Sequence, residues 1–331
     1  MNEREALLAA IQTHPEEDTP RLVFADWVQE FGDEATAEFI RVQVALARTP
    51  ERDPTAVELR RRESELLAAY RALWVGTRAS IAPIDAWEFE RGFVAGLNLA
   101  RKELGATGVA ALVASRHLAN ISTLDLSFNL IGAAGESGVE ALANSPFLAH
   151  LMTLNLNNNA ICAAGVEALA ASPYLDNLTT LNLENNAIGT YSLLDAGMSA
   201  LAASPLMTKL TSLDLDGNTI GTAGVAAFAS SLWVTKLTKL NLRRNLIRAS
   251  GAEALAQSRH LANLSILDLC TNSLGAAGVE VLIVDAMRYR PHPTHAHQSH
   301  SSPSPRCTTT RRVCECRHSR NARPGGVDGI G

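Results

Sequence analysis

Aromatic residues are scarce in this chain. Phe, Trp and Tyr make up 5% of its 331 residues, although 47% of the residues are hydrophobic. A core built from Leu, Ala, Val and Ile with few large rings favours thin repeated layers over one globular centre. The composition therefore favours a fold built from internal repeats.

Long hydrophobic runs and a cysteine framework are also absent. No run of about 18 apolar residues occurs, and the charged start Met1–Glu5 lacks the apolar segment of a signal peptide. The five cysteines are odd in number and irregularly placed. These absences predict a cytoplasmic protein that binds no membrane.

The charge is divided unevenly along the chain. A net charge of −5 does not indicate a nucleic-acid partner. Residues 291–331 nevertheless hold six Arg against two acidic residues, and they show no apolar period. We expect a disordered tail there. The alternative is out-of-frame translation, because the last helical pattern decays at Ile283–Asp285 without the polar cap that a solenoid needs. The His and Cys spacings of the tail match no standard zinc module, so no metal or cofactor is predicted.

Capping signals predict a bundle of four helices in residues 1–80. Asn2 and Glu5 form a capping box, and Thr19 is expected to cap the second helix with Pro20 at its first position. The caps expected for the third and fourth helices are Asp33 and Asp53.

This region resembles a known bacterial module. The stretch Asp18–Trp27, followed by Gly32-Asp33 and Ala37–Gln43, is similar to the repeat-companion domain of planctomycetes and myxobacteria. The resemblance covers roughly residues 1–50 and implies a companion to a repeat array, without a defined activity. Asp26 and Arg41 are expected to form a surface ion pair or a cap.

An apolar ladder repeats through residues 81–290. Aligned on one Asn, the units are spaced by 30, 27, 32, 27 and 27 residues, with Leu or Ile eight, five and three positions before that Asn. A degenerate first unit carries Lys102 in its place, which makes about seven units. The aligned residues form a structural Asn ladder: Asn129, Asn159, Asn186, Asn218, Asn245 and Asn272.

Within each unit the apolar period changes from 2 to about 3.6, which predicts a strand followed by a helix. A recurrent Gly is expected to supply a tight turn into that helix, and the Asn to satisfy backbone groups of its own and neighbouring units. Because helices are about 10 Å wide and strands lie about 4.8 Å apart, stacked units must curve. The predicted fold class is α/β: a solenoid with a curved parallel sheet inside and helices outside, preceded by an all-α module.

The pattern Leu-x-x-Leu-x-Leu-x-x-Asn, in 27-residue units with Gly-x-x-Gly before the helix, resembles the leucine-rich repeat family. The subtype is similar to that of ribonuclease inhibitor and the Ran GTPase-activating protein. The resemblance implies a curved solenoid.

Side chains between the inward leucines face out of the concave sheet and form a polar, mostly acidic floor with one basic step. We expect an unidentified protein partner to dock there on a monomeric chain. The residues predicted to contact it are Asp125, Phe128, Asn155, Asn157, Asn182, Glu184, Asp214, Asp216, Asn241, Arg243, Arg244 and Asp268.

No catalytic constellation accompanies this floor. The four His before residue 291 have no Ser, Cys or carboxylate at triad-like spacing, so no enzyme activity is predicted. One alternative is GTPase activation through Arg243 or Arg244. The others are a passive spacer, and binding at the loop edge that carries insertions near 134–136 and 190–194.

Overall fold

The computed structural model describes residues 2–14, 17–133, 135, 137–189, 195–288 and 312–313. The chain starts with four helices and a β-hairpin, and strand–helix units follow. The first elements are α1 (Glu3–Thr13), α2 (Thr19–Glu30), α3 (Glu34–Arg48), α4 (Pro54–Val75), β1 (Trp87–Glu90) and β2 (Phe93–Asn98). The further strands are β3 (Thr123–Asp125), β4 (Thr153–Asn155), β5 (Thr180–Asn182), β6 (Ser212–Asp214), β7 (Lys239–Asn241), β8 (Ile266–Asp268) and β9 (Arg312–Val313). The further helices are α5 (Gly105–Val113), α6 (Ser137–Ala143), α7 (Cys162–Ala170), α8 (Ala196–Ala203), α9 (Thr222–Ala229), α10 (Ala249–Gln257) and α11 (Gly275–Arg288).

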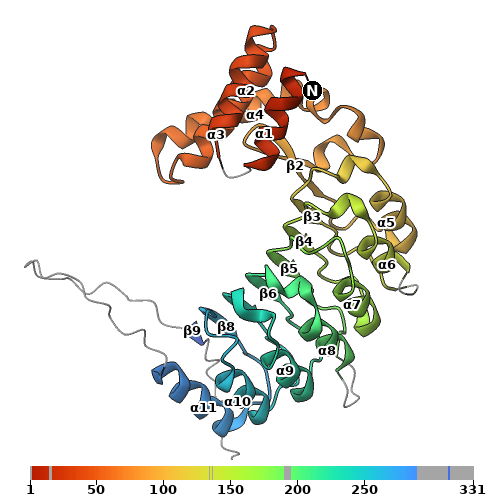
Figure 1. The fold of residues 1–331 in the computed structure, drawn as a ribbon, viewed down its shortest axis with the longest axis vertical. Helices are drawn as coiled ribbons and strands as arrows, with labels where there is room; N and C mark the ends of the chain where they lie inside the picture. The colour runs from red at the N-terminus through yellow and green to blue at the C-terminus, as the bar shows by residue number, and fades with distance from the viewer. Residues whose placement is uncertain are drawn as a thin grey trace, which may run out of the picture.

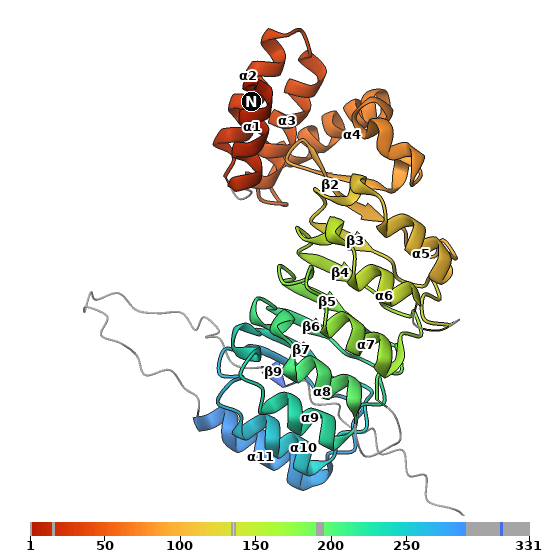
Figure 2. The ribbon, with the colours of Figure 1, turned by 45° about the vertical axis from the view of Figure 1, so that its right-hand side comes forward.

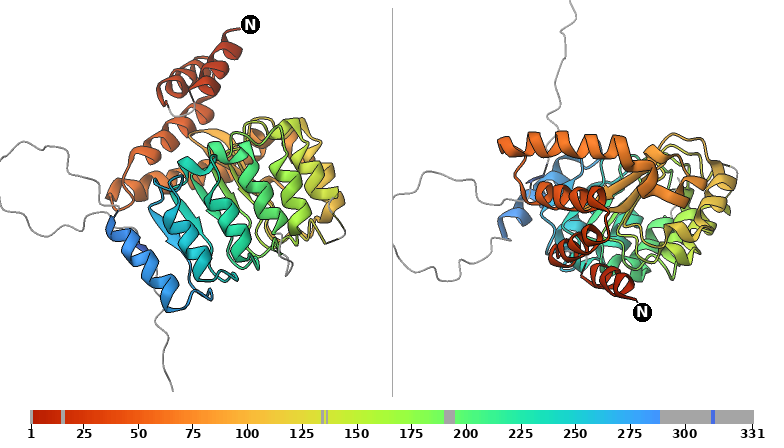
Figure 3. Two further views of the ribbon diagram at one scale, coloured as in Figure 1. Left: turned by 60° about the horizontal axis from the view of Figure 1, so that its bottom comes forward. Right: turned by 90° about the horizontal axis from the view of Figure 1, so that it is seen from above.

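The strands form one curved sheet. Within the described residues it contains nine strands in chain order, antiparallel between β1 and β2 and parallel from β2 to β9. The strands line the inside of an arc and α5–α11 its outside (Figures 1 and 2). Figure 3 shows these helices side by side in one outer layer. The predicted α/β solenoid with an N-terminal helical module is confirmed.

Buried asparagines hold neighbouring units together. Asn159 is fully buried, and its Nδ2 donates to the carbonyl oxygens of Leu126 (2.9 Å) and Leu156 (3.0 Å). Its Oδ1 accepts the backbone N–H of Asn129 at 2.9 Å. Each Asn thus satisfies backbone groups of two units. The same donation to the preceding unit is made by Asn129, Asn186, Asn218, Asn245 and Asn272.

A second ladder, of serines, runs where each outer helix ends. The Ser145 hydroxyl donates to the carbonyl oxygen of Val113, in the preceding unit, at 2.5 Å. The sequence shows these serines as a recurrent feature without indicating this role. The other members of the ladder are Ser172, Ser204, Ser231 and Ser258.

The recurrent glycine has a role other than the expected one. The helical glycines Gly138 and Gly165 do not have positive φ. A Cβ on Gly138 would lie 2.7 Å from the Cα of Ala106 in the preceding helix, and one on Gly165 would lie 2.5 Å from Ile161 Cγ2. The prediction of a tight turn was wrong, because glycine is required here for close packing.

The β1–β2 hairpin joins the helical module to the sheet, and no sequence pattern predicted it. Gly92, at its turn, has a φ of 92° and donates its N–H to Gln43 Oε1 in α3 at 2.5 Å. The Phe93 ring packs in a tilted arrangement against Phe24 of the module, with ring centroids 5.6 Å apart. Leu97 of the same strand is fully buried in the solenoid core. The module therefore caps the N-terminal end of the array, where Figure 3 (right) shows it from above.

Most predicted caps are present. The Asn2–Glu5 capping box forms, and the Asp33 and Asp53 carboxylates accept backbone N–H groups of α3 and α4. Thr19 as the cap of α2 was wrong. Asp18 occupies the cap position and makes no capping bond, because its carboxylate pairs with Arg48 at 2.6 Å.

The C-terminal end also differs from expectation. The helical pattern does not decay at Ile283–Asp285, since α11 continues to Arg288. Of the tail at 291–331, only Arg312–Val313 lie within the described residues, where they form β9. Of the predicted loop insertions, 134, 136 and 190–194 lie outside them.

Asn218→Ala should lower the free energy of unfolding by about 3 kcal/mol. The substitution removes the acceptor of the Asn186 N–H (2.8 Å) and the donor to Leu183 (2.8 Å), both inside the core. Urea denaturation measures the effect. Asn144→Ala, at an exposed helix end, is the control and should cost no more than about 0.5 kcal/mol. Equal losses in the two variants would contradict a structural role for the ladder.

Gly92→Ala should destabilise the module junction by about 3 kcal/mol. Its new Cβ would meet Ile40 Cγ1 at 2.4 Å, in addition to the strain of a positive φ. Gly32 has a similar φ of 86° with nothing within 4 Å, so Gly32→Ala isolates the strain and should cost about 1 kcal/mol. Thermal unfolding of both variants tests the difference.

Candidate interaction surface on the concave sheet

The last outward-facing residue of each strand from β2 to β8 is Asp or Asn. We call these the Asx row: Asn98, Asp125, Asn155, Asn182, Asp214, Asn241 and Asp268. Each side chain accepts the backbone N–H two residues further on, at 2.8–3.1 Å. These bonds turn the chain at the end of each strand, which explains why the residue type recurs.

Neighbouring members of the Asx row also bind each other. Asn155 Nδ2 donates to Asp125 Oδ2 at 2.9 Å, and Asn241 Nδ2 donates to Asp214 Oδ2 at 3.1 Å. All four side chains are half-buried. Both oxygens of each aspartate therefore serve the fold, and a partner would have to compete for them.

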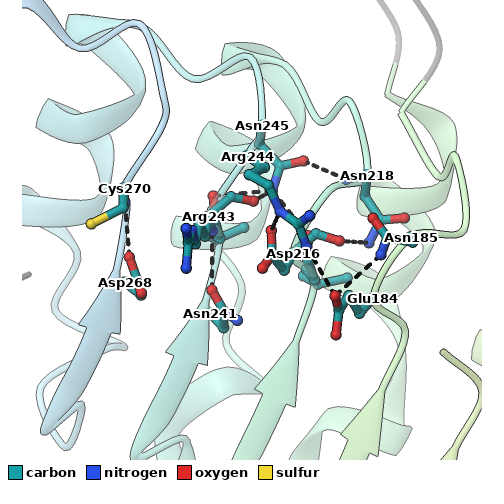
Figure 4. Close-up of polar contacts among 12 residues, drawn as sticks. Glu184, Asn185, Asp216, Asn218, Asn241, Arg243, Arg244, Asn245, Asp268 and Cys270 are labelled. Carbon is teal, nitrogen blue, oxygen red and sulfur yellow. Dashed lines mark hydrogen bonds and ion pairs between the residues drawn. The ribbon is translucent and has the colours of Figure 1, made fainter. Parts of the chain in front are cut away.

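An ionic cluster spans three units along the edge where the strands end (Figure 4). Arg244 Nε lies 2.7 Å from Asp216 Oδ1, and Nη2 lies 2.9 Å from Glu184 Oε1. The Asp216 hydrogen bond raises the pKa of Arg244 above its ordinary value. Asn157 and Asn185 complete the cluster by donating to Glu184 at 3.3 and 3.1 Å. Asp216 was expected to face a partner, but it is only 7% exposed because Arg244 of the next unit covers it.

Two basic residues at and just after strand β7 are exposed on the concave face. Lys239 and Arg243 point from one face of this segment, both are exposed, and neither forms an ion pair with any residue that the structure describes. On β8, Ile266 is 46% exposed at the position that holds Lys239 in β7 and Thr or Ser in β3–β6. Lys239 and Ile266 lay outside the predicted contact set, although the outward period of the strands marks both positions.

The first units present an aromatic contact on the same edge. The Arg101 guanidinium carbon lies 3.9 Å from the centre of the half-buried Phe128 ring. Phe128 was among the predicted contact residues and Arg101 was not. Arg101 precedes Lys102 as Phe128 precedes Asn129, so the alignment of units identifies it.

Comparisons with known proteins bear on the repeat array. A family model described as leucine-rich repeat matches residues 147–170, 207–229 and 235–256. No match was found among curated proteins. The crystal structure of an internalin (inlF) from Listeria monocytogenes aligns at 21% identity and a TM-score of 0.34. That alignment covers 53% of this chain and 48%, less than half, of the internalin chain.

The array is a leucine-rich repeat solenoid, in which each parallel strand pairs with the equivalent residues of the next unit. Among the described residues, no helix is long and apolar enough to cross a membrane.

Arg244→Ala should lower the free energy of unfolding by about 1 kcal/mol, because it removes two ion pairs and leaves Asp216 buried without its cation. Arg243→Ala is the matched control and should change stability by less than about 0.5 kcal/mol. The difference should shrink in 1 M NaCl, where the screening length falls to about 3 Å. Denaturant titrations at low and high salt measure it, and identical losses at both arginines would contradict the cluster's role.

Proposed function

We propose that this protein is a binding scaffold, without catalysis, whose concave sheet holds a protein partner. The observation that carries the proposal is that two exposed cations at and just after β7, which form no ion pair within the described part of the chain, lie beside the exposed Ile266 of β8. Charged groups steer association and set specificity, while an apolar contact supplies desolvation energy. Lys239, Arg243 and Ile266 are therefore the proposed centre of the contact.

Eight of the remaining predicted contact residues divide into two roles. Asn182, Glu184, Asp268 and Phe128 are half-buried and border this centre or extend it along the floor. Asp125, Asn155, Asp214 and Asn241 serve first to shape the strand ends, through the bonds of the Asx row. We propose that they contribute shape and polarity rather than free charge.

A GTPase-activating role gains little support from the geometry. Arg244 is engaged by two carboxylates, so entering a nucleotide site would require breaking both ion pairs. Arg243 is then the only one of the two predicted arginines that is free to act. Binding of a protein partner therefore remains the proposed function.

The flanking assignments are proposals as well. The four helices and the hairpin that fastens them to the first repeat unit fit a repeat-companion module that acts as the N-terminal cap. Units with one outer helix each fit the subtype of ribonuclease inhibitor. We propose a monomer in the cytoplasm that binds no nucleic acid and no membrane.

Site-specific photocrosslinking tests which face binds. A benzoylphenylalanine at Thr180, on β5, should crosslink a partner in native lysate, and one at Glu167, on the outer face of α7, should not. The crosslinked protein is identified by mass spectrometry and then purified for calorimetry. Crosslinks formed from Glu167 alone would contradict the proposal.

Lys239→Glu with Arg243→Glu should weaken binding of that purified partner by at least about tenfold, or 1.4 kcal/mol. Arg116→Glu with Arg259→Glu is the control, because it changes the net charge equally at exposed sites on the edge where outer helices lead to strands. The control should alter affinity less than about twofold. Equal effects of the two double variants would contradict a specific contact at Lys239 and Arg243, because the change in net charge alone would then explain the weaker binding.

A further inference from the structure

Two neighbouring loops differ from the other loops at the edge where outer helices lead to strands. They run from α8 to β6 and from α9 to β7, over residues 204–211 and 231–238. The Thr238 N–H donates to the Thr211 carbonyl oxygen at 2.8 Å, so the two loops lie side by side. Figure 2 shows α8 and α9 as neighbours in the outer layer. Side chains that are peculiar to these loops therefore meet on one surface.

The first difference is a lysine in place of a bridging asparagine. In the loops before β5 and β8, Asn177 and Asn263 each donate from Nδ2 to a backbone carbonyl of the preceding loop at 2.7 Å. The equivalent residues before β6 and β7 are Lys209 and Lys236, and both are exposed. Lys209 donates to Asn177 Oδ1 at 2.6 Å, but neither lysine forms an ion pair with any residue that the structure describes. Stacking of the units favours Asn at this position, so the fold does not explain the two lysines.

The second difference is an exposed apolar pair, Leu232 and Trp233. In the loop before β6 a short 3₁₀ turn, Pro205–Thr208, begins directly after the ladder serine, as it does before β3 and β4. In the loop before β7 this turn begins later, at Val234–Lys236. Leu232 is 69% exposed and Trp233 40%, whereas Leu206, the equivalent of Trp233, is 3% exposed. The shifted turn thus presents an aromatic side chain that is buried in the neighbouring loop.

The third difference is the absence of negative charge around these side chains. Neither loop contains Asp or Glu, and neither α8 nor α9 does. The position that holds Glu140, Glu167 and Glu253 in other outer helices holds Ser199 and Ala226 in these two. Because the whole chain has a net charge of −5, two lysines without acidic neighbours in sequence or helix are a local exception.

We infer that Lys209, Leu232, Trp233 and Lys236, which we call the basic edge, dock an acidic peptide segment of a protein partner. Carboxylates of the segment pair with the two ammonium groups, and an apolar side chain between them covers Leu232 and Trp233. Exposed Trp side chains are the kind that anchor protein contacts, because they bury a large area with little loss of conformational freedom.

The overall charge favours a short acidic segment over a polyanion. A nucleic acid or an anionic membrane meets the negative field of the whole chain, whereas a short segment meets only the charges within about one screening length, about 8 Å at physiological salt. The basic edge borders the concave floor but contains none of the contact residues proposed there. Neither proposal therefore depends on the other.

A random peptide library displayed on phage is the probe. The library is first depleted on the full chain with Lys209→Glu and Lys236→Glu, which also removes peptides that bind the concave face. It is then selected on the unaltered full chain. Peptides that survive should combine Asp or Glu with Trp, Phe or Leu. No enriched peptide, or enriched peptides without acidic residues, would overturn the inference.

Fluorescence polarisation of the enriched peptides measures each part of the surface. Lys209→Glu with Lys236→Glu should weaken binding at least about tenfold, and Leu232→Ser with Trp233→Ser at least about fivefold. The control, Lys239→Glu with Arg243→Glu on the concave face, makes the same change in charge and should weaken binding less than about threefold. Unchanged binding to the Leu232 and Trp233 variant, or equal losses in the two charge reversals, would overturn the inference.

Polyuridine RNA and phosphatidylserine vesicles test the other classes of partner on the same variants. Neither should bind in a way that depends on Lys209 and Lys236. Binding of either probe that Lys209→Glu with Lys236→Glu abolishes would overturn the inference in favour of a nucleic-acid or membrane surface. Thermal unfolding of the edge variants should match that of the unaltered chain, because all four side chains are exposed.

Discussion

The structure depends on one constraint, namely that each chain turn after a strand buries backbone groups that only a neighbouring unit can satisfy. The ladder asparagines meet it, since Asn159 donates to carbonyls of two units and accepts an N–H from one of them. The residues on either side of Asn129, Asn159, Asn186 and Asn218 adopt a left-handed backbone, as Phe128 and Leu130 do at φ values of 58° and 56°. At Asn245 and Asn272 only the preceding residue does so. These conformations recur with the units, so they mark the repeat and not a special site.

The same constraint decides what the concave face can offer a partner. The Asx row looks like an acidic and amide-rich floor. Its oxygens, however, accept backbone N–H groups at the strand ends and side-chain N–H groups of neighbouring units. The charge that remains available is concentrated at and just after β7, where Lys239 and Arg243 form no ion pair with any residue that the structure describes. A polar surface in a repeat protein is therefore first a consequence of stacking and only secondarily a recognition surface.

The two ends of the array meet the constraint differently. At the N-terminal end, the β1–β2 hairpin supplies an antiparallel strand and fastens the helical module through Gly92 and Phe93. At the C-terminal end, the described residues of β9 pair in parallel with β8, Arg312 with Ile266 and Val313 with Leu267. Because each unit of a solenoid contacts only its neighbours, the first and last units depend on elements outside the repeat pattern for their outer pairing.

The sequence by itself determined the repeat period, the order of strand and helix in each unit, the inward leucines and the position of the ladder Asn. These are local patterns, and the side-chain alternation of strands and helices converts them directly into faces. Only the tertiary structure decided that Asp216 is covered by Arg244 of the next unit, that Gly138 must admit the helix of Ala106, and that a hairpin binds the first helices to the sheet. Each of these depends on residues that are distant in the chain and become neighbours only when the units stack, which no local periodicity records.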